Sequence, residues 1–297
     1  MALSPRIVVV HRRTELEELL DRHGTRGQAE FFLRTRGRGL ADVQARHDAI
    51  TEAIQTVSTA IPTGWRRGRV ERGDLDRFLF DPEDVLVVVG QDGLVANLAK
   101  YLDGQPVIGV DPEPGRNPGI LVRHAPATFA GLLLAVVQQR ASIEHRTMVE
   151  AVTDDDQSLV ALNEIYLGHP SHQSARYTLT SPDERSERQS SSGILAGTGT
   201  GATGWLASAS GERRSRLTLP GPTEPLLAWF VREAWPSPVT GTDLTEGLCD
   251  GSAELRVLVE GDSLVAFGDG LERDHLTPTW GQTITLRVAD RRLALVT

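Results

Sequence analysis

The side chain best suited to chemistry in this sequence lies in a glycine turn at residues 90–93, Gly-Gln-Asp-Gly. An apolar run at residues 85–89 precedes the turn, and a helical pattern carrying Leu94 and Leu98 follows it. A strand therefore passes through the turn into a helix. We expect the Asp92 carboxylate at the carboxyl end of a buried strand, where open α/β sheets bind their ligands. The alternative is that Asp92 only caps the helix and the glycines only form the turn.

Three later segments also carry polar groups in an unusual setting. Asn163 and Glu164 follow the apolar residues 159–162, and a strand that buries such a pair must supply it with partners. Residues 198–205, Thr-Gly-Thr-Gly-Ala-Thr-Gly-Trp, offer hydroxyls and backbone N–H groups with little bulk. A Gly-Asp-Gly sequence surrounds Asp269. These segments suit contact with a polar ligand, although each alone is also compatible with an ordinary turn.

The residues before and after the turn at 90–93 are predicted to form alternating strands and helices. Strands are predicted at residues 6–10, 85–89 and 107–110, and helices at 14–24, 40–57 and 126–140. The first helix begins with a capping box, Thr-Glu-Leu-Glu at residues 14–17. The apolar strands lack polar alternation, which is typical of a parallel sheet covered on both faces. We therefore predict an α/β domain over residues 1–142.

The remainder of the chain has the pattern of a β-rich domain. Short alternating or apolar runs occur at residues 159–167, 176–180, 255–259, 264–267 and 283–288, separated by Gly, Pro and Ser. Residues 207–250 are rich in proline and glycine, so long connections with one strand at 226–231 are predicted there. The acidic triplet at 154–156 reads as a hairpin turn, and His169 and His172 as loop residues. No metal ligand is assigned.

Composition narrows the classes of function. A chain of 297 residues is expected to form two domains. Its net charge of −9 disfavours nucleic acid as a partner, and its single cysteine excludes an internal disulfide or a multi-cysteine metal site. The only lysine is Lys100, so a Walker-type phosphate loop is impossible. No apolar run is long enough to span a membrane and a strand begins near the N-terminus, from which we expect a cytoplasmic protein without a membrane partner.

Taken in order, these segments resemble the NAD kinase family. Its pattern is a Gly-Gly-Asp-Gly turn after a strand, an Asn-Glu pair, a Thr-x-Thr-Gly run and a late Asp-Gly. The similarity is closest to the mitochondrial-type branch. That branch resembles this chain at residues 107–119, with Val-Ile-Gly-Val, Asp-Pro and Gly, and at 191–205, with Ser-Ser-Gly, Thr-Gly-Thr-Gly and Trp.

The resemblance implies a fold, a reaction and a set of site residues. The fold is an N-terminal α/β domain with a parallel sheet, a β-rich, sandwich-like dinucleotide-binding domain at 143–277, and a tail at 278–297 that returns to the first domain. The reaction transfers the γ-phosphoryl group of ATP to the 2′-hydroxyl of NAD, giving NADP, with Mg²⁺ or another divalent metal; a homodimer or higher homo-oligomer is implied too. Asp92 would be the catalytic carboxylate. The implied substrate- and nucleotide-binding residues are Gly90, Gln91, Gly93, Asn163, Glu164, Thr198, Thr200, Gly201, Thr203 and Asp269.

Two residues of the catalytic turn depart from the family pattern. Gln91 replaces the second glycine, which adds bulk beside the expected phosphate and penalises any positive φ there. Leu94 replaces a threonine, which removes a hydroxyl from the start of the helix. Two alternatives therefore remain: a kinase of the same fold with a different nucleoside or metabolite acceptor, or a catalytically silent regulator that binds NAD or NADP.

Overall fold

The computed structural model describes residues 4–116 and 119–297, and the chain folds as two compact units. The first unit contains Met1–Glu144 together with Ala294–Thr297, and the second contains His145–Leu293. Asn117 and Pro118, which belong to the segment of the family resemblance at 107–119, lie outside the described residues. None of the described helices is both long enough and apolar enough to cross a membrane.

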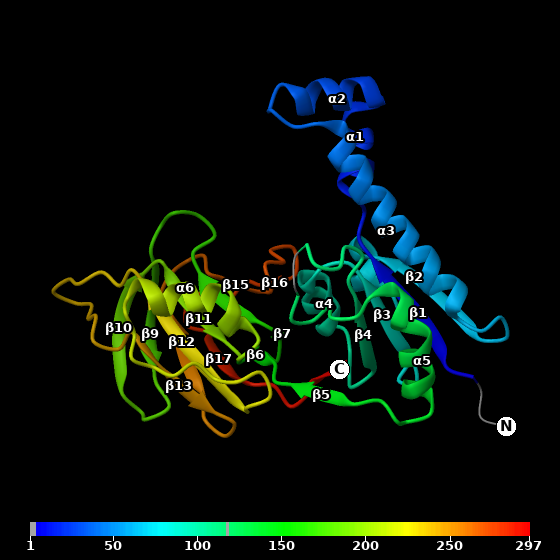
Figure 1. Ribbon diagram of the computed structural model, residues 1–297. Helices are drawn as coiled ribbons and strands as arrows, with labels where there is room; N and C mark the ends of the chain where they lie inside the picture. The colour runs from blue at the N-terminus through cyan, green and yellow to red at the C-terminus, as the bar shows by residue number, and fades with distance from the viewer. Residues whose placement is uncertain (1–3, 117–118) are drawn as a thin grey trace. The chain divides into compact units, whose positions relative to one another are not determined.

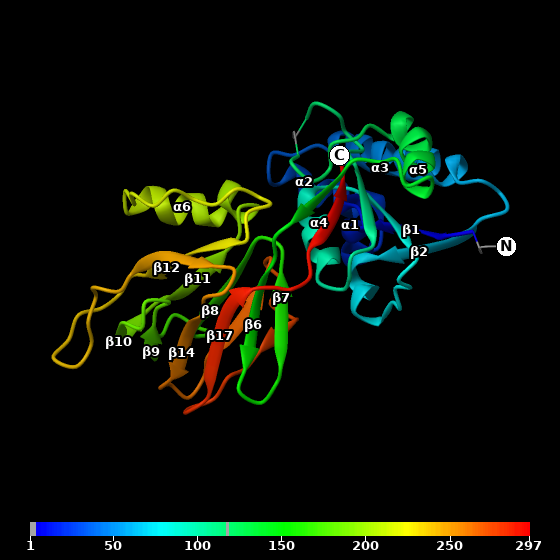
Figure 2. The ribbon, with the colours of Figure 1, turned by 90° about the horizontal axis from the view of Figure 1, so that it is seen from below.

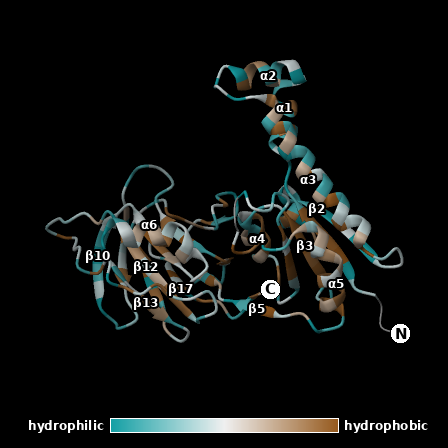
Figure 3. Cartoon of the chain, in the orientation of Figure 1, coloured by the Kyte–Doolittle hydropathy of each residue, from teal (hydrophilic) through white to brown (hydrophobic). Residues whose placement is uncertain are grey.

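A six-stranded sheet forms the centre of the first unit (Figure 1). The strand order is β2-β1-β3-β4-β18-β5, and every pair from β2 to β18 is parallel. The bounds are β1 Arg6–His11, β2 Arg66–Glu71, β3 Val85–Val89, β4 Pro106–Val110, β5 Ile143–Arg146 and β18 Leu293–Val296. All five residues of β3 are buried, and the strand is hydrophobic along its length (Figure 3). The prediction of a parallel α/β sheet is confirmed.

Helices α3 (Leu40–Ala60) and α5 (Phe129–Val137) cover one face of this sheet, where Val57 and Leu133 join a core with the strand residues. The short 3₁₀ helix η2 (Pro126–Thr128) leads into α5. Helix α4 (Asp92–Ala99) packs on β4 and on the 3₁₀ helix η1 (Arg72–Arg77). The sheet and α4 therefore fix the position of the turn that contains Asp92.

Two further helices lie beside the N-terminal end of α3, beyond the sheet (Figure 1). They are α1 (Glu15–His23) and α2 (Arg26–Arg34), and they share a small separate core with α3. The predicted capping box at Thr14 and Glu17 is confirmed, and Gly24 ends α1 with a φ of 75°. Sequence patterns missed α2 and β2. The sequence of β2, Arg-Arg-Gly-Arg-Val-Glu, lacks an apolar run because the strand forms the edge of the sheet.

The second unit contains two antiparallel six-stranded sheets (Figure 2). One has the order β10-β9-β14-β17-β6-β7, with β6 Val149–Thr153, β7 Ser158–Ala161, β9 Ala175–Thr180, β10 Ser186–Ser191, β14 Leu255–Val259 and β17 Thr283–Val288. The other has the order β13-β12-β11-β8-β15-β16, with β8 Glu164–Gly168, β11 Gly193–Gly197, β12 Leu226–Arg232, β13 Glu246–Asp250, β15 Val265–Gly268 and β16 His275–Leu276. Side chains of both sheets form one buried core, so the predicted β-sandwich-like domain is confirmed.

One helix covers the outer face of the second sheet. It is α6 (Trp205–Glu212), which follows the 3₁₀ helix η3 (Gly201–Thr203) and buries Leu206 against Leu195 and Phe230. The proline and glycine content of residues 207–250 predicts loops there. The structure instead has the end of α6 and the whole of β13 in this range, and the sequence analysis missed both. The small residues of α6 give it only a weak apolar face.

Two predicted boundaries are wrong. Residues 159–167 form two strands, β7 and β8, instead of one, because the chain bends at Leu162 and Asn163. Asn163 therefore lies between strands, and Glu164 begins β8. The returning tail is also shorter than 278–297, since β17 pairs with β14 and β6 inside the second unit and only Ala294–Thr297 belongs to the first.

Candidate functional site

Asp92 holds a neighbouring loop through three hydrogen bonds. It is the first residue of α4, whose N-cap is Gln91, and the cap makes no side-chain hydrogen bond. The Asp92 carboxylate instead accepts backbone N–H groups from the loop after β4, from Ile120 at 2.8 Å and from Leu121 and Val122 at 2.9 Å. The alternative that Asp92 only caps its own helix is therefore wrong. The carboxylate connects the turn after β3 to the segment after β4.

These bonds leave the two carboxylate oxygens unequal. Oδ1 accepts from both Leu121 and Val122, whereas Oδ2 accepts from Ile120 alone. A carboxylate oxygen has two lone pairs, so Oδ2 can accept one further proton donor. Gly119 makes the close approach possible, because a Cβ there would lie 2.5 Å from Asp92 Oδ1.

The turn itself needs no unusual backbone conformation. Gln91 has φ −108° and ψ 164°, which is extended, and its side chain is exposed. Neither Gly90 nor Gly93 has a positive φ. The penalty for positive φ that the sequence analysis attached to Gln91 therefore does not arise. Leu94 is buried and would lie 3.1 Å from a Cβ placed on Gly90, so it packs beneath the turn.

In the second unit, Asp269 holds the bend between β7 and β8. Its carboxylate accepts the N–H of Leu162 at 2.9 Å and of Asn163 at 2.7 Å, and its own N–H donates to the Glu164 carbonyl at 3.1 Å. Asp269 has a φ of 53°, a left-handed conformation that aspartate tolerates better than most residues. Asp269 thus fixes the backbone that presents Asn163 and Glu164.

The Thr-Gly run contacts the same bend from the other side. The fully buried Thr198 donates its hydroxyl to the Leu162 carbonyl at 2.6 Å, and its N–H donates to the Asn163 carbonyl at 2.9 Å. Gly201 lies against the bend, since a Cβ there would be 2.4 Å from the Asn163 carbonyl oxygen. Three segments that are far apart in the sequence therefore meet around Asn163.

These contacts fix the backbone of the bend but use neither the Asn163 amide nor the Glu164 carboxylate. Among the described residues, neither the Asn163 amide nor the Glu164 carboxylate forms a side-chain hydrogen bond, and both side chains are half-buried. Burial, and next the nearby charge of Asp269, raises the pKa of Glu164 to about 7. Half-buried polar groups without a protein partner are expected to meet water or a ligand. The bend therefore presents one amide and one carboxyl group of raised pKa for binding.

The remaining candidates differ in exposure. Thr200 is fully buried and accepts a hydrogen bond from Arg146 at 3.3 Å, whereas Thr203 is exposed and donates its hydroxyl to the Thr200 carbonyl at 3.1 Å. The sequence analysis missed Arg146, because nothing in the run Glu-His-Arg-Thr indicates that the arginine is buried. It also missed the loop at Ile120 to Val122, whose contribution is made by backbone N–H groups.

Several residues that the sequence left without a role have structural ones. Residues 154–156 form the turn between β6 and β7, with Asp156 at a φ of 65°, and His169 lies in a loop, as predicted. Within residues 4–116 and 119–297, no group of three or more His, Cys, Asp or Glu side chains is placed to hold a metal ion.

Comparison with known proteins supports the motif pattern. The chain is 27% identical over 231 residues to an NAD kinase of Chlorobaculum tepidum, a match that covers 76% of this chain and 74% of the relative. No protein-family model matches the chain.

Two solved structures have a similar fold. Yeast NADH kinase complexed with NADH superposes with a TM-score of 0.62 at 14% identity, covering 100% of this chain and 84% of that one. An NAD kinase from Archaeoglobus fulgidus in complex with ATP superposes with a TM-score of 0.59 at 16% identity, covering 98% and 93%. The comparisons therefore confirm the resemblance to the NAD kinase family, and this chain has the fold of that family.

Proposed function

We propose that the protein is an NAD kinase, which transfers the γ-phosphoryl group of ATP to the 2′-hydroxyl of NAD and produces NADP. The proposal rests mainly on the two polar side chains that the bend at Asn163 and Glu164 presents. Asp269 and Thr198 hold its backbone from two sides, yet the amide and the carboxyl group that it presents have no hydrogen-bond partner within residues 4–116 and 119–297. A nucleoside with several hydroxyl groups would satisfy both. The NAD kinase relative and the NADH- and ATP-bound neighbours support this class of ligand.

The remaining members of the proposed binding set surround that bend or the turn after β3. Thr200, Gly201 and Thr203 supply hydroxyls and a surface without side chains beside the bend. The N–H of Gly90 donates to the Val110 carbonyl at 3.1 Å, so the proposed anion contact at the start of α4, where the helix dipole favours an anion, falls to the exposed Gly93. Arg146 holds the Thr200 hydroxyl in place and is proposed as a positioning residue.

Asp92 is the proposed catalytic residue. Phosphoryl transfer requires that the attacking hydroxyl be oriented and that its proton be accepted late in the reaction. The second lone pair of Asp92 Oδ2 can perform both tasks, because the three bonds to Ile120, Leu121 and Val122 fix the carboxylate without using it. The same bonds make the orientation of Asp92 depend on the loop at 120–122.

The proposal includes Mg²⁺ bound together with ATP. Mg²⁺ is usually held by substrate phosphates, waters and one or two carboxylates, so ATP would bring most of its ligands. When bound, the ion would offset the charge of the phosphates. A cytoplasmic location, a homo-oligomeric state and the closer relationship to the mitochondrial-type branch remain predictions.

The direct test is to incubate the purified protein with NAD, ATP and Mg²⁺ and to measure NADP with an NADP-specific dehydrogenase. We expect NADP to accumulate in proportion to enzyme concentration. Binding of NAD without NADP formation would contradict the kinase and favour a silent regulator. Consumption of ATP with another hydroxyl-bearing metabolite, and not with NAD, would show that the acceptor is different.

Replacing Gln91 with glycine tests whether the departure from the family pattern affects the reaction. Because Gln91 is exposed and extended, the variant is expected to retain turnover. The added freedom of the unfolded chain, about 0.5–1 kcal/mol, is opposed by the preference of helix N-caps for glycine, so stability should change by less than about 1 kcal/mol. Steady-state NADP formation and urea unfolding measure the two effects. A loss of turnover in the folded variant would instead assign the Gln91 side chain a contact with substrate.

A further inference from the structure

The loop at 120–122, which holds the Asp92 carboxylate, lies directly against strand β4. A Cβ placed on Gly109 would be 2.1 Å from the Leu121 carbonyl oxygen, so the approach requires a glycine at that position. Just after the loop, the N–H of His124 donates to the Gly109 carbonyl at 3.1 Å. The backbone of the loop is therefore tied to β4 at two points.

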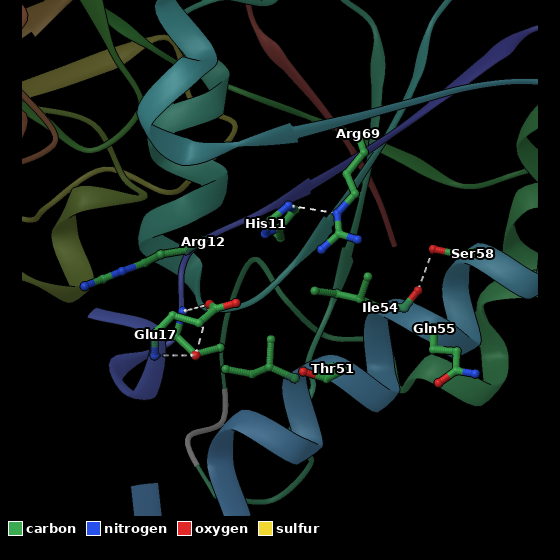
Figure 4. Close-up of a pocket in the computed structure, with 10 residues that line it drawn as sticks. His11, Arg12, Glu17, Thr51, Ile54, Gln55, Ser58 and Arg69 are labelled. Carbon is green, nitrogen blue, oxygen red and sulfur yellow. Dashed lines mark hydrogen bonds between the residues drawn. The ribbon is translucent and has the colours of Figure 1, made fainter. Parts of the chain in front are cut away.

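Arg123 holds the start of the same loop through its side chain. Its Nε donates to the Ile120 carbonyl at 2.6 Å, and its Nη1 lies 3.7 Å from Oε2 of Glu144. The Arg123 side chain is 37% exposed, so solvent weakens the ion pair, but a bond from a cationic donor stays stronger than one between neutral groups. In contrast, Nε of Arg69 donates to a side chain, Nε2 of His11, at 2.9 Å (Figure 4). Arg123 is therefore placed to act on the backbone of the loop.

The carbonyl of Ile120 and the N–H of Leu121 belong to one peptide group. Because a peptide group is planar, the direction of its carbonyl fixes the direction of its N–H. That N–H donates to Oδ1 of Asp92 at 2.9 Å. A cationic donor on the carbonyl also polarises the peptide group and makes its N–H a stronger donor. Arg123 is thus connected to the Asp92 carboxylate through a single peptide group.

We propose that Arg123 is a positioning residue, which orients the Asp92 carboxylate through the peptide group between Ile120 and Leu121. The orientation matters because Oδ1 accepts two loop N–H groups, while Oδ2 keeps a lone pair for the hydroxyl that is to be phosphorylated. When this peptide group tilts, Oδ1 loses a donor and the carboxylate can rotate away from the hydroxyl. This role of Arg123 rests on the proposed catalytic function of Asp92.

Arg123→Met tests this role, because methionine keeps most of the side-chain length and removes the charge and the donors. At equal folded fraction, kcat for NADP formation is expected to fall about three- to tenfold, the range for one hydrogen bond, while KM for NAD and for ATP changes less than about twofold. Arg123→Lys, which keeps a cationic donor, should have a kcat between those of Arg123→Met and the unmodified protein. Arg140→Met is the control: Arg140 is exposed and bonded to the side chain of Gln138, so its replacement should change kcat less than about twofold.

Urea unfolding of a double-mutant cycle gives a second measurement that needs no activity. Arg123→Met is expected to raise the unfolding equilibrium constant about fivefold in the unmodified protein and less than about twofold in Asp92→Asn, because an amide oxygen is a weaker acceptor than a carboxylate for the polarised N–H. Arg69→Met is the control, since among the described residues Arg69 and Asp92 share no hydrogen-bond partner. Its effect should be the same in both backgrounds.

Either of two results would overturn the proposal. The first is an effect of Arg123→Met on unfolding that is equal in both backgrounds, which would mean that Arg123 supports the loop without acting on Asp92. The second is an unchanged kcat in the folded Arg123→Met variant, and a raised KM beside it would make Arg123 a substrate contact instead. An absence of NADP formation by the unmodified protein would contradict the proposed function, and the unfolding cycle would still show whether Arg123 orients Asp92.

Discussion

Replacing Asp92 with asparagine is expected to lower kcat for NADP formation by about 10²–10⁴-fold, the usual contribution of a positioned proton acceptor. The same change should also destabilise the fold. An amide has only one accepting oxygen, and Asp92 accepts three N–H groups with two oxygens. With the amide NH₂ in the place of Oδ2, the N–H of Ile120 would face it, which costs about 1–3 kcal/mol; in the place of Oδ1, the N–H groups of both Leu121 and Val122 would. Steady-state kinetics and urea unfolding of the same preparation measure both effects.

Asparagine at position 92 therefore changes chemistry and structure together, and a second variant must separate them. Gly119→Ala keeps the carboxylate but places a Cβ 2.5 Å from Asp92 Oδ1, so it displaces the loop or rotates the carboxylate. If Asp92 accepts the proton, Asp92→Asn should lose at least tenfold more kcat than Gly119→Ala at equal folded fraction. Equal losses in the two variants would mean that Asp92 serves only to hold the loop at 120–122.

Much of the architecture follows from local patterns in the sequence. Unalternated apolar runs such as Val85–Val89 predict buried parallel strands, and the capping box at Thr14 marks the start of α1 within one residue. The failures share a physical cause. Strand β2 and the buried Arg146 are polar in sequence and acquire their place through pairing with distant segments, which no local pattern reports.

The sequence predicted which segments form the candidate site, but it did not predict the hydrogen bonds among them. The Asn-Glu pair, the Thr-Gly run and the late Asp-Gly do meet around one bend. The sequence could not show that Asp269 binds backbone N–H groups rather than presenting its carboxylate for a ligand, because that depends on a left-handed conformation at residue 269. Nor could it show that the partners of Asp92 are N–H groups nearly thirty residues away.

Replacing Glu164 with glutamine is expected to stabilise the protein above neutral pH while weakening dinucleotide binding. In the folded protein, burial and the charge of Asp269 raise the pKa of Glu164 from 4.5 to about 7. The folded state therefore binds more protons than the unfolded state between these two pH values. Stability consequently falls as pH rises through that window, and the loss is complete above about pH 7.

The size of the effect follows from the two pKa values. A difference of one pKa unit corresponds to about 1.4 kcal/mol, so Glu164 lowers stability by up to about 3 kcal/mol above neutral pH, and by less to the extent that water reaches the carboxylate. A neutral glutamine of nearly the same shape avoids this cost. The gain in unfolding free energy of Glu164→Gln should grow from near zero at pH 4 to about 1–3 kcal/mol at pH 8.

Urea unfolding between pH 4 and pH 8 measures this gain, with Glu272→Gln as an exposed control that should show no such trend. A protein that retains a carboxylate at this cost is expected to use it, because stability is commonly lost where binding requires a strained or charged site. NAD affinity should therefore fall in the same variant that unfolds later. Stabilisation without loss of NAD affinity would show that Glu164 contacts no ligand, and a gain independent of pH would show that its carboxyl group does not titrate near 7.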